Sequence, residues 1–136
     1  MCLVIDQKAT NDLKQRFEES KDGTLTFWKC YEAGTDILYP PCRANCPYLT
    51  FGKVISDRVS KQLSACEKKC QIVNQGIHVF TTRNAATAWD HGYGYIIVKV
   101  TAHKNDLVSG GFHNEAVFMK VTISKRTWSN IFGAEK

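Results

Sequence analysis

Four of the six cysteines have a spacing that could support metal chemistry. They form two pairs with three residues inside each pair, Cys42 with Cys46 and Cys66 with Cys70. Two such pairs can supply four thiolates to a tetrahedral zinc ion. On a helix, Cys66 and Cys70 would lie one turn apart and could face the same ion. One interpretation is therefore a structural zinc site at these four residues.

The same cysteines have two other interpretations. Cys66 and Cys70 continue an apolar stripe that begins with Val59 and Leu63, so they could be small core residues with free thiols. A disulfide link is the remaining alternative. Because the chain starts MCLVIDQKAT, without the basic segment and apolar run of a secretory signal, we expect a cytoplasmic protein whose thiols stay reduced.

Arginines near turns and expected helix starts indicate recognition of an anion. Arg58 and Arg83 lie close to expected helix N-termini, where backbone N–H groups already favour negative charge. A guanidinium adds bidentate hydrogen bonds to phosphate or carboxylate, and Arg43 follows a Pro-Pro turn signal. The aromatic residues that could stack on a base are Trp28, Tyr31, Phe51 and Trp89. Together these residues predict a pocket for a nucleotide-like molecule; solvated arginines and core aromatics are the alternative.

Two histidines flank the segment between the last two expected strands. If Ala102 pairs near Glu115, then His103 and His113 emerge at the same end of the sheet. With Asp106 they could form a metal or phosphate site. Solvated loop histidines are the simpler interpretation. We retain His113 as a candidate ligand-binding residue.

The common catalytic motifs are absent from the sequence. It contains no GxxxxGK[ST], no GxGxxG, no GxSxG and no HExxH. No complete catalytic constellation stands out either. We therefore expect a protein that binds a partner without turnover, and leave a rarer enzyme class open.

Composition favours one globular domain. The chain has 136 residues, of which 43% are hydrophobic and 11% aromatic, enough apolar side chain for a core. The formal net charge is +5, but the basic residues are scattered, so dedicated nucleic-acid binding is not favoured. No apolar run reaches the roughly 18–20 residues that cross a bilayer, and we expect no membrane span. The sequence leaves open whether the protein forms a homodimer.

Periodicity in the first half of the chain predicts two helices and two strands, and residues 37–39 could return as a further short strand. We expect an edge strand at 2–5, a helix with Thr10 as its N-cap, a central strand at 24–33 and a helix at 57–70. Residues 40–70 form a candidate insertion. Side chains on the central strand alternate between two faces, with Leu25, Phe27 and Tyr31 on one and Trp28 and Cys30 on the other.

The second half predicts a strand at 77–81, a helix capped by Thr82, and two alternating strands at 95–102 and 115–124. We expect the last two to form an antiparallel pair. A C-terminal segment with Trp128 should cover an open face. The fold class is therefore α+β, a single compact domain with a mostly antiparallel sheet of about five or six strands and two or three short helices.

Five segments carry a first resemblance: MCLVI, FWKCYEAG, LYPPCR, GIHVFTT and AATAW. Over most of its length the chain resembles a group of small uncharacterised proteins carried by phages and other viruses. The four paired cysteines are not part of this pattern. The resemblance implies a viral or mobile-element accessory protein that acts in the host cytoplasm. No activity comes with this resemblance. The arginines and aromatic residues near turns, together with the missing catalytic constellation, lead us to expect a host protein or a phosphate-bearing small molecule as the partner.

A second resemblance concerns the order of elements. The segments GIHVF, NAATAW, YIIVKVTA and AVFMKVTIS are similar to ADP-ribosyltransferase-like folds. The resemblance implies that Glu115 would be the only acidic residue near the position of the catalytic glutamate, and no neighbouring Gln, Glu or Ser-Thr-Ser accompanies it. The alternatives to a binding protein are therefore a nucleotide-processing enzyme and a zinc-stabilised interaction module.

Overall fold

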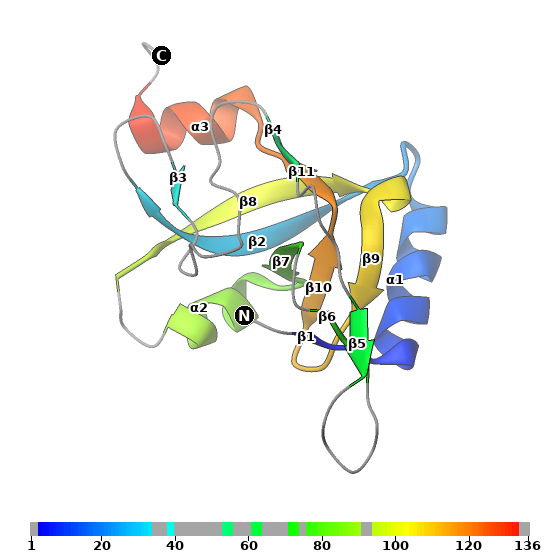
Figure 1. Cartoon of the computed structure of the whole chain (residues 1–136). Coiled ribbons are helices and arrows are strands. Elements are labelled where there is room, and N and C mark those ends of the chain that lie inside the picture. Colours follow the sequence, from blue (N-terminus) through cyan, green and yellow to red (C-terminus); the bar gives the residue numbers. More distant parts are fainter. Residues whose placement is uncertain are drawn as a thin grey trace.

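An antiparallel sheet forms the centre of the molecule (Figure 1). The computed structural model describes residues 3–33, 38–39, 53–55, 61–63, 71–73, 76–90 and 94–133. In spatial order the strands are β4 (Lys53–Ile55), β11 (Lys120–Thr122), β8 (Ile96–His103), β2 (Thr24–Ala33), β7 (Ile77–Phe80), β10 (Glu115–Phe118) and β9 (Leu107–Gly110), and β3 (Leu38–Tyr39) pairs with β2. Within these ranges the α-helices are α1 (Gln7–Glu19), α2 (Arg83–Asp90) and α3 (Lys125–Phe132), with a 3-10 helix η1 (Lys104–Asp106). The predicted α+β class with an antiparallel sheet is confirmed.

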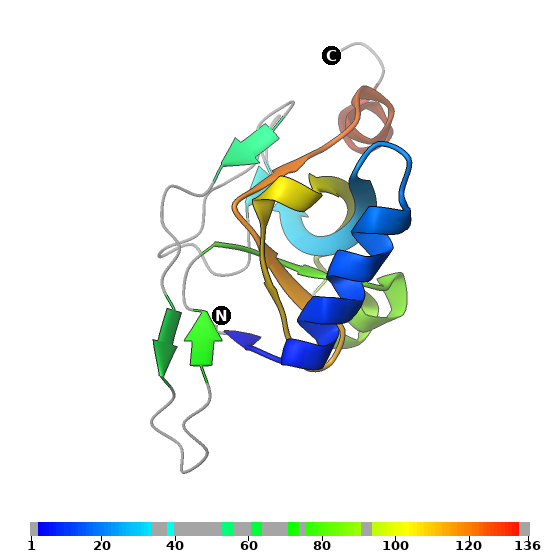
Figure 2. The same cartoon turned by 90° about the vertical axis from the view of Figure 1, so that its right-hand side faces the viewer.

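A smaller three-stranded sheet lies beside the N-terminus, as Figure 2 shows. Its order is β1 (Leu3–Val4), β6 (Gln71–Val73) and β5 (Lys61–Leu63). The predicted helix at 57–70 is therefore wrong at Lys61–Leu63, because pairing with β6 overrides a short apolar stripe. The rest of that predicted helix lies outside the described residues.

The central strand carries two apolar faces, as predicted. On one face Phe27 packs against Phe17 of α1 and Phe118 of β10, with ring centroids 6.2 and 4.8 Å away. Trp128 of α3 is buried in the same core, which confirms the expected cover by the C-terminal segment. Burial of these large rings is the main stabilising contribution on this side of the sheet.

The other face of β2 is covered by α2. Cys30, Phe80 and Ala86 are buried there. The predicted Thr82 cap is confirmed, since its hydroxyl accepts a hydrogen bond from the Ala85 N–H at 3.1 Å. The two faces of the strand thus pack against different helices.

The predicted antiparallel pairing of the last two strands is confirmed for the later part of 115–124 and wrong for its first part. The segment 115–124 breaks at Met119, and Glu115 pairs with Phe80 of β7. The later part, β11, contacts β8 through the Thr122–Thr101 pair, while β8 pairs with β2 along its whole length. Alternation fixes which face a side chain takes but not which strand lies alongside.

Helix α1 begins earlier than predicted. Its N-cap is Asp6, whose Oδ1 accepts from the Lys8 N–H at 3.1 Å. Thr10 is buried inside the helix and contacts β9 instead. Asp and Thr are both good caps, so sequence preference did not separate them. Among the described residues no helix is long and apolar enough to cross a membrane.

Candidate functional site

A pocket of about 280 Å³ lies between α1 and the turn that joins β9 to β10. We call it the α1 pocket. Its lining residues are Asp6, Ala9, Asp12, Leu13, Arg16, Thr81, Gly111, Phe112, His113, Asn114 and Glu115. The helical contributions recur every three or four positions, so a single flank of α1 forms one wall.

The helix is held against β9 at very short range. A Cβ atom on Gly110 would lie 2.9 Å from the Ala9 carbonyl carbon and 2.9 Å from the Thr10 nitrogen. The Thr10 hydroxyl accepts from the Gly110 N–H at 2.9 Å and donates to the Asp6 carbonyl at 2.9 Å. Only glycine allows this approach, which holds α1 beside the strand that leads into the β9–β10 turn.

The opposite wall is a strained turn. His113 and Asn114 both have φ of 62°, in the left-handed region. His and Asn are among the non-glycine residues enriched there, yet each still costs about 1–3 kcal/mol. Two backbone hydrogen bonds hold the turn, from Gly111 N–H to the Glu115 carbonyl and from Thr81 N–H to the Asn114 carbonyl, each 2.8 Å long. The His113 side chain is thereby held exposed at the edge of the pocket.

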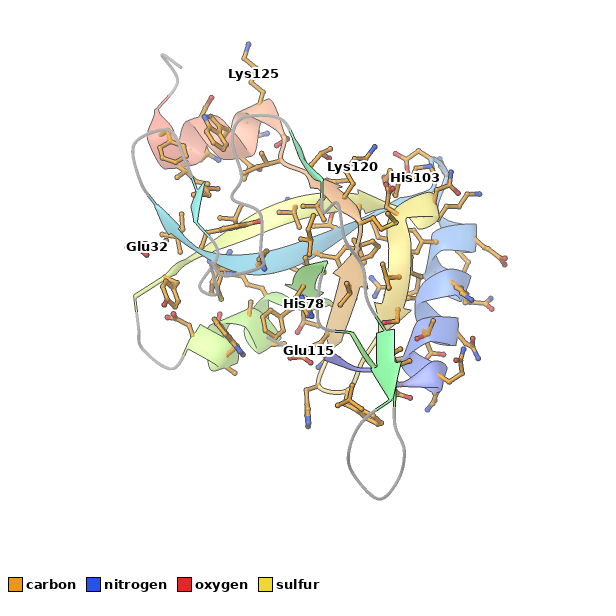
Figure 3. All side chains as sticks on the ribbon, in the orientation of Figure 1. Glu32, His78, His103, Glu115, Lys120 and Lys125 are labelled. Atoms are coloured by element: carbon orange, nitrogen blue, oxygen red, sulfur yellow. The ribbon has the colours of Figure 1, made fainter. Side chains whose placement is uncertain are left out.

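Glu115 is a half-buried carboxyl group of the pocket. Burial raises its pKa, and the charge of His113 partly opposes that rise. In Figure 3, Glu115 lies at the lower end of the sheet, well apart from His103 and Lys120. A carboxyl with a raised pKa can accept hydrogen bonds when ionised and donate one when protonated.

The pocket therefore combines opposite charges with an aromatic edge. Arg16 and His113 are cationic or able to become so, whereas Asp6, Asp12 and Glu115 are carboxylates. Phe112 beside them is 48% exposed, so its ring is accessible at the edge of the pocket. Such a lining suits a ligand that carries both an anionic group and N–H donors.

The predicted ligand residues separate in space. His113 lines the α1 pocket, but Arg83 is exposed at the first position of α2 and does not line it. The predicted stacking set is wrong as a single surface, because Tyr31 is buried in the core on one face of β2 while Trp28 and Trp89 belong to the cluster on the other. Outside the described residues lie Arg43, Phe51, Arg58 and the four paired cysteines, Cys42, Cys46, Cys66 and Cys70.

The predicted meeting of His103 and His113 is also wrong. Ala102 pairs with Leu25 and not with Glu115, so the two histidines end at different places. His103 lines a separate groove, together with Asp106. The pairing assumption failed because β9, within the supposed loop, pairs with β10.

Arg16 and Phe112 were missed by sequence reasoning. The spacing of Asp12 and Arg16 indicates a shared helix face, which is a usable signal. Nothing in the sequence indicates that the β9–β10 turn packs against that face.

Cys30, the cysteine that the structure describes, is buried and is not a reactive thiol. Its Sγ donates to the Ala86 carbonyl at 3.3 Å. Burial, with a smaller contribution from the negative charge of Asp90, raises the pKa of its thiol to about 11. Within the described part of the chain, no group of three or more His, Cys, Asp or Glu side chains could hold a metal ion. The proposed zinc site at the paired cysteines lies outside it.

No protein-family model matches the chain, and no curated protein or solved structure gives a match. The two resemblances drawn from the sequence therefore stay predictions. Of the residues they involve, Thr81 and Glu115 line the α1 pocket.

Proposed function

We propose that this protein binds a nucleotide-like, phosphate-bearing small molecule in the α1 pocket and captures it without turnover. The proposal includes its role as a viral or mobile-element accessory protein in the host cytoplasm. The observation that supports small-molecule binding is the joint presence of Arg16, His113 and Glu115 in one pocket beside the exposed ring of Phe112.

The phosphate group would contact the cationic side chains. Arg16 can form two parallel hydrogen bonds to phosphate oxygens, and His113 on the opposite wall adds a donor. One oxygen of Asp6 is already engaged as the N-cap of α1, which leaves Asp12 as the acidic neighbour of Arg16 on the helix. A phosphate would therefore approach from the Arg16 end of the pocket.

The base would contact the aromatic and carboxyl groups. Stacking on an aromatic ring is worth about 1–3 kcal/mol per base. The Glu115 carboxylate can accept hydrogen bonds from exocyclic or ring N–H groups, as acidic side chains do when they read a base edge. A volume of about 280 Å³ is at the small end for ligand pockets, so we expect one nucleotide unit and not a dinucleotide.

Calorimetry with nucleoside monophosphates tests this function, after a thermal-shift screen. Arg16→Ala should weaken binding about tenfold or more, because it removes a charged hydrogen-bond donor. Phe112→Ala should weaken it by at least about fivefold, because it removes the stacking surface.

Matched controls come from α3 and β10–β11. Arg126 is another exposed helix arginine, and Met119 is an apolar side chain with similar exposure, 44%. Arg126→Ala and Met119→Ala should bind like the wild type. If no phosphate ligand shifts the unfolding temperature, the small-molecule function is wrong and capture of a host protein is the version left.

The half-buried Glu115 supports a second candidate function, nucleotide processing. A carboxyl with a raised pKa in a ligand pocket is suited to general acid–base work. The test is incubation with NAD and with a labelled lysate, comparing wild type with Glu115→Gln. Loss of NAD or a labelled product in the wild type only would support it, and the absence of both would exclude it for this substrate.

A further inference from the structure

A second concave site lies at the far end of the sheet from Glu115. It is a groove of about 460 Å³ at the ends of β2, β8 and β11, beside η1. We call it the threonine groove. Its lining residues are Thr24, Thr101, Ala102, His103, Asn105, Asp106, Lys120, Val121 and Thr122, and it shares none of them with the α1 pocket. In Figure 3, His103 and Lys120 lie close together at this end.

Strand register places the polar side chains of the groove on one face. Thr24 pairs with His103, and Thr101 pairs with Thr122. Because side chains alternate along a strand, Lys120 takes the same face as Thr122. The intervening residues Val100, Ala102 and Val121 point to the core and are buried.

His103 lines the groove and has one ring nitrogen engaged by the backbone. Its Nδ1 accepts from the Asn105 N–H at 3.1 Å, which assigns the proton of the neutral ring to Nε2. The ring packs against Gly23, where a Cβ would lie 3.1 Å from Nε2. The nearby Asp22 has its Oδ1 occupied by the hydroxyl of Thr24, at 2.7 Å.

The groove mixes one cation with hydroxyl, amide and carboxyl groups. Lys120 is half-buried in the groove and supplies the ammonium group. Asn105 and Asp106 supply an amide and a carboxylate at the η1 side. No aromatic ring other than the His103 imidazole is among the lining residues, so nothing there offers the broad stacking surface that a base would use.

From this lining we infer that the threonine groove binds a small phosphorylated polyol, a sugar phosphate in chemical class. Lys120 and His103 donate hydrogen bonds to the phosphate oxygens. Asp106 and Asn105 accept hydrogen bonds from the ligand hydroxyls, and the threonine hydroxyls complete the polar wall. This site is independent of the ligand proposed for the α1 pocket.

The test is an amide NMR titration of the full chain with three probes: glucose 6-phosphate, inorganic phosphate and glucose. We expect glucose 6-phosphate to shift the amides of Thr101, His103 and Thr122, and to bind more tightly than either part alone. Lys120→Ala should weaken binding about tenfold or more, because it removes the charged donor. Lys125→Ala, which removes an exposed lysine of α3 outside the groove, should have no effect.

A further variant separates the two halves of the site. Asp106→Asn should reduce affinity for glucose 6-phosphate while it leaves inorganic phosphate binding unchanged or stronger, since it removes a carboxylate and keeps the fold of η1. The proposal is overturned if glucose 6-phosphate shifts none of the three amides, if Lys120→Ala and Lys125→Ala weaken binding equally, or if inorganic phosphate binds as tightly as the ester. Wild-type-like spectra of the variants verify that they are folded.

Discussion

The α1 pocket and the threonine groove are built by different physical means. The pocket exists because a helix approaches a strand at Gly110 and because a turn adopts left-handed backbone angles at His113 and Asn114. The groove exists because residues alternate along paired strands, with Thr24 opposite His103. Substitutions at the contact between α1 and β9 should therefore perturb the α1 pocket, whereas the threonine groove should keep its structure.

The largest effect should follow Gly110→Ala. The added Cβ would overlap the backbone of α1 at 2.9 Å, and backbone cannot move aside as a flexible side chain can. We expect a loss of about 3 kcal/mol in the free energy of unfolding, at the upper end for overpacking. Urea denaturation measures it.

The same variant tests the contrast between the two sites. Amide shifts of residues in the α1 pocket should change throughout, while those of Thr101 and Thr122 in the groove should stay close to wild type. Equal perturbation of both regions would mean that the pocket is no more dependent on docking than the groove.

The next effect should follow Thr10→Val, which keeps the shape and removes the hydroxyl. The buried Gly110 N–H would lose its 2.9 Å partner. An unsatisfied buried donor costs about 2 kcal/mol. Thr10→Ser keeps the hydroxyl and should lose much less than Thr10→Val in the same urea denaturation. A loss for Thr10→Ser as large as that for Thr10→Val would contradict the dominant role assigned to the hydroxyl, because Thr10→Ser keeps the hydroxyl and removes the methyl group.

Sequence reasoning predicted the parts of the fold that depend on backbone geometry alone. Alternation correctly separated Phe27 from Trp28 on the two faces of β2, because side-chain direction is a local property. It did not predict that β10 pairs with β7, because any alternating strand can pair with any other. The break at Met119 carries no sequence signal that periodicity detects.

The same distinction explains the candidate sites. His113 was retained from residue type and position, and it does line a pocket. Arg16 was not identified from the sequence, because its place in the pocket depends on the contact between Thr10 and Gly110, which are a hundred positions apart in the chain. Local sequence patterns do not predict which elements far apart in the chain pack together.

A smaller effect, of opposite sign, should follow His113→Gly. Glycine adopts a φ of 62° without steric cost, so the variant should gain about 1 kcal/mol in stability. It also removes the imidazole from the α1 pocket and should weaken nucleotide binding. Thermal unfolding and calorimetry on the same protein measure both changes. A variant that is less stable than wild type would show that the imidazole makes a stabilising contact that outweighs the strain.

The smallest effect concerns the pH dependence of stability. Glu115 in the α1 pocket and Asp22 beside the threonine groove should change stability with pH in opposite directions. Burial raises the pKa of Glu115 in the α1 pocket above its ordinary value of 4.5. The folded protein therefore holds this proton more tightly than the unfolded chain, and the Glu115 contribution to stability falls as pH rises from about that value through the raised pKa. Glu115→Gln should be more stable than wild type at neutral pH and equal to it at pH 4.

Asp22, beside the threonine groove, should show the reverse. Hydrogen bonds from Thr24, with a smaller contribution from the charge of His103, lower the pKa of Asp22 below 3.8. Its contribution to stability is present above that value and is lost as pH falls through the lowered pKa, so Asp22→Asn should be less stable than wild type at neutral pH. Urea denaturation from pH 3 to pH 7 measures both variants. Two curves that deviate from wild type in the same direction at neutral pH would contradict the different surroundings assigned to these carboxyl groups, because burial penalises the ionised form and hydrogen bonding favours it.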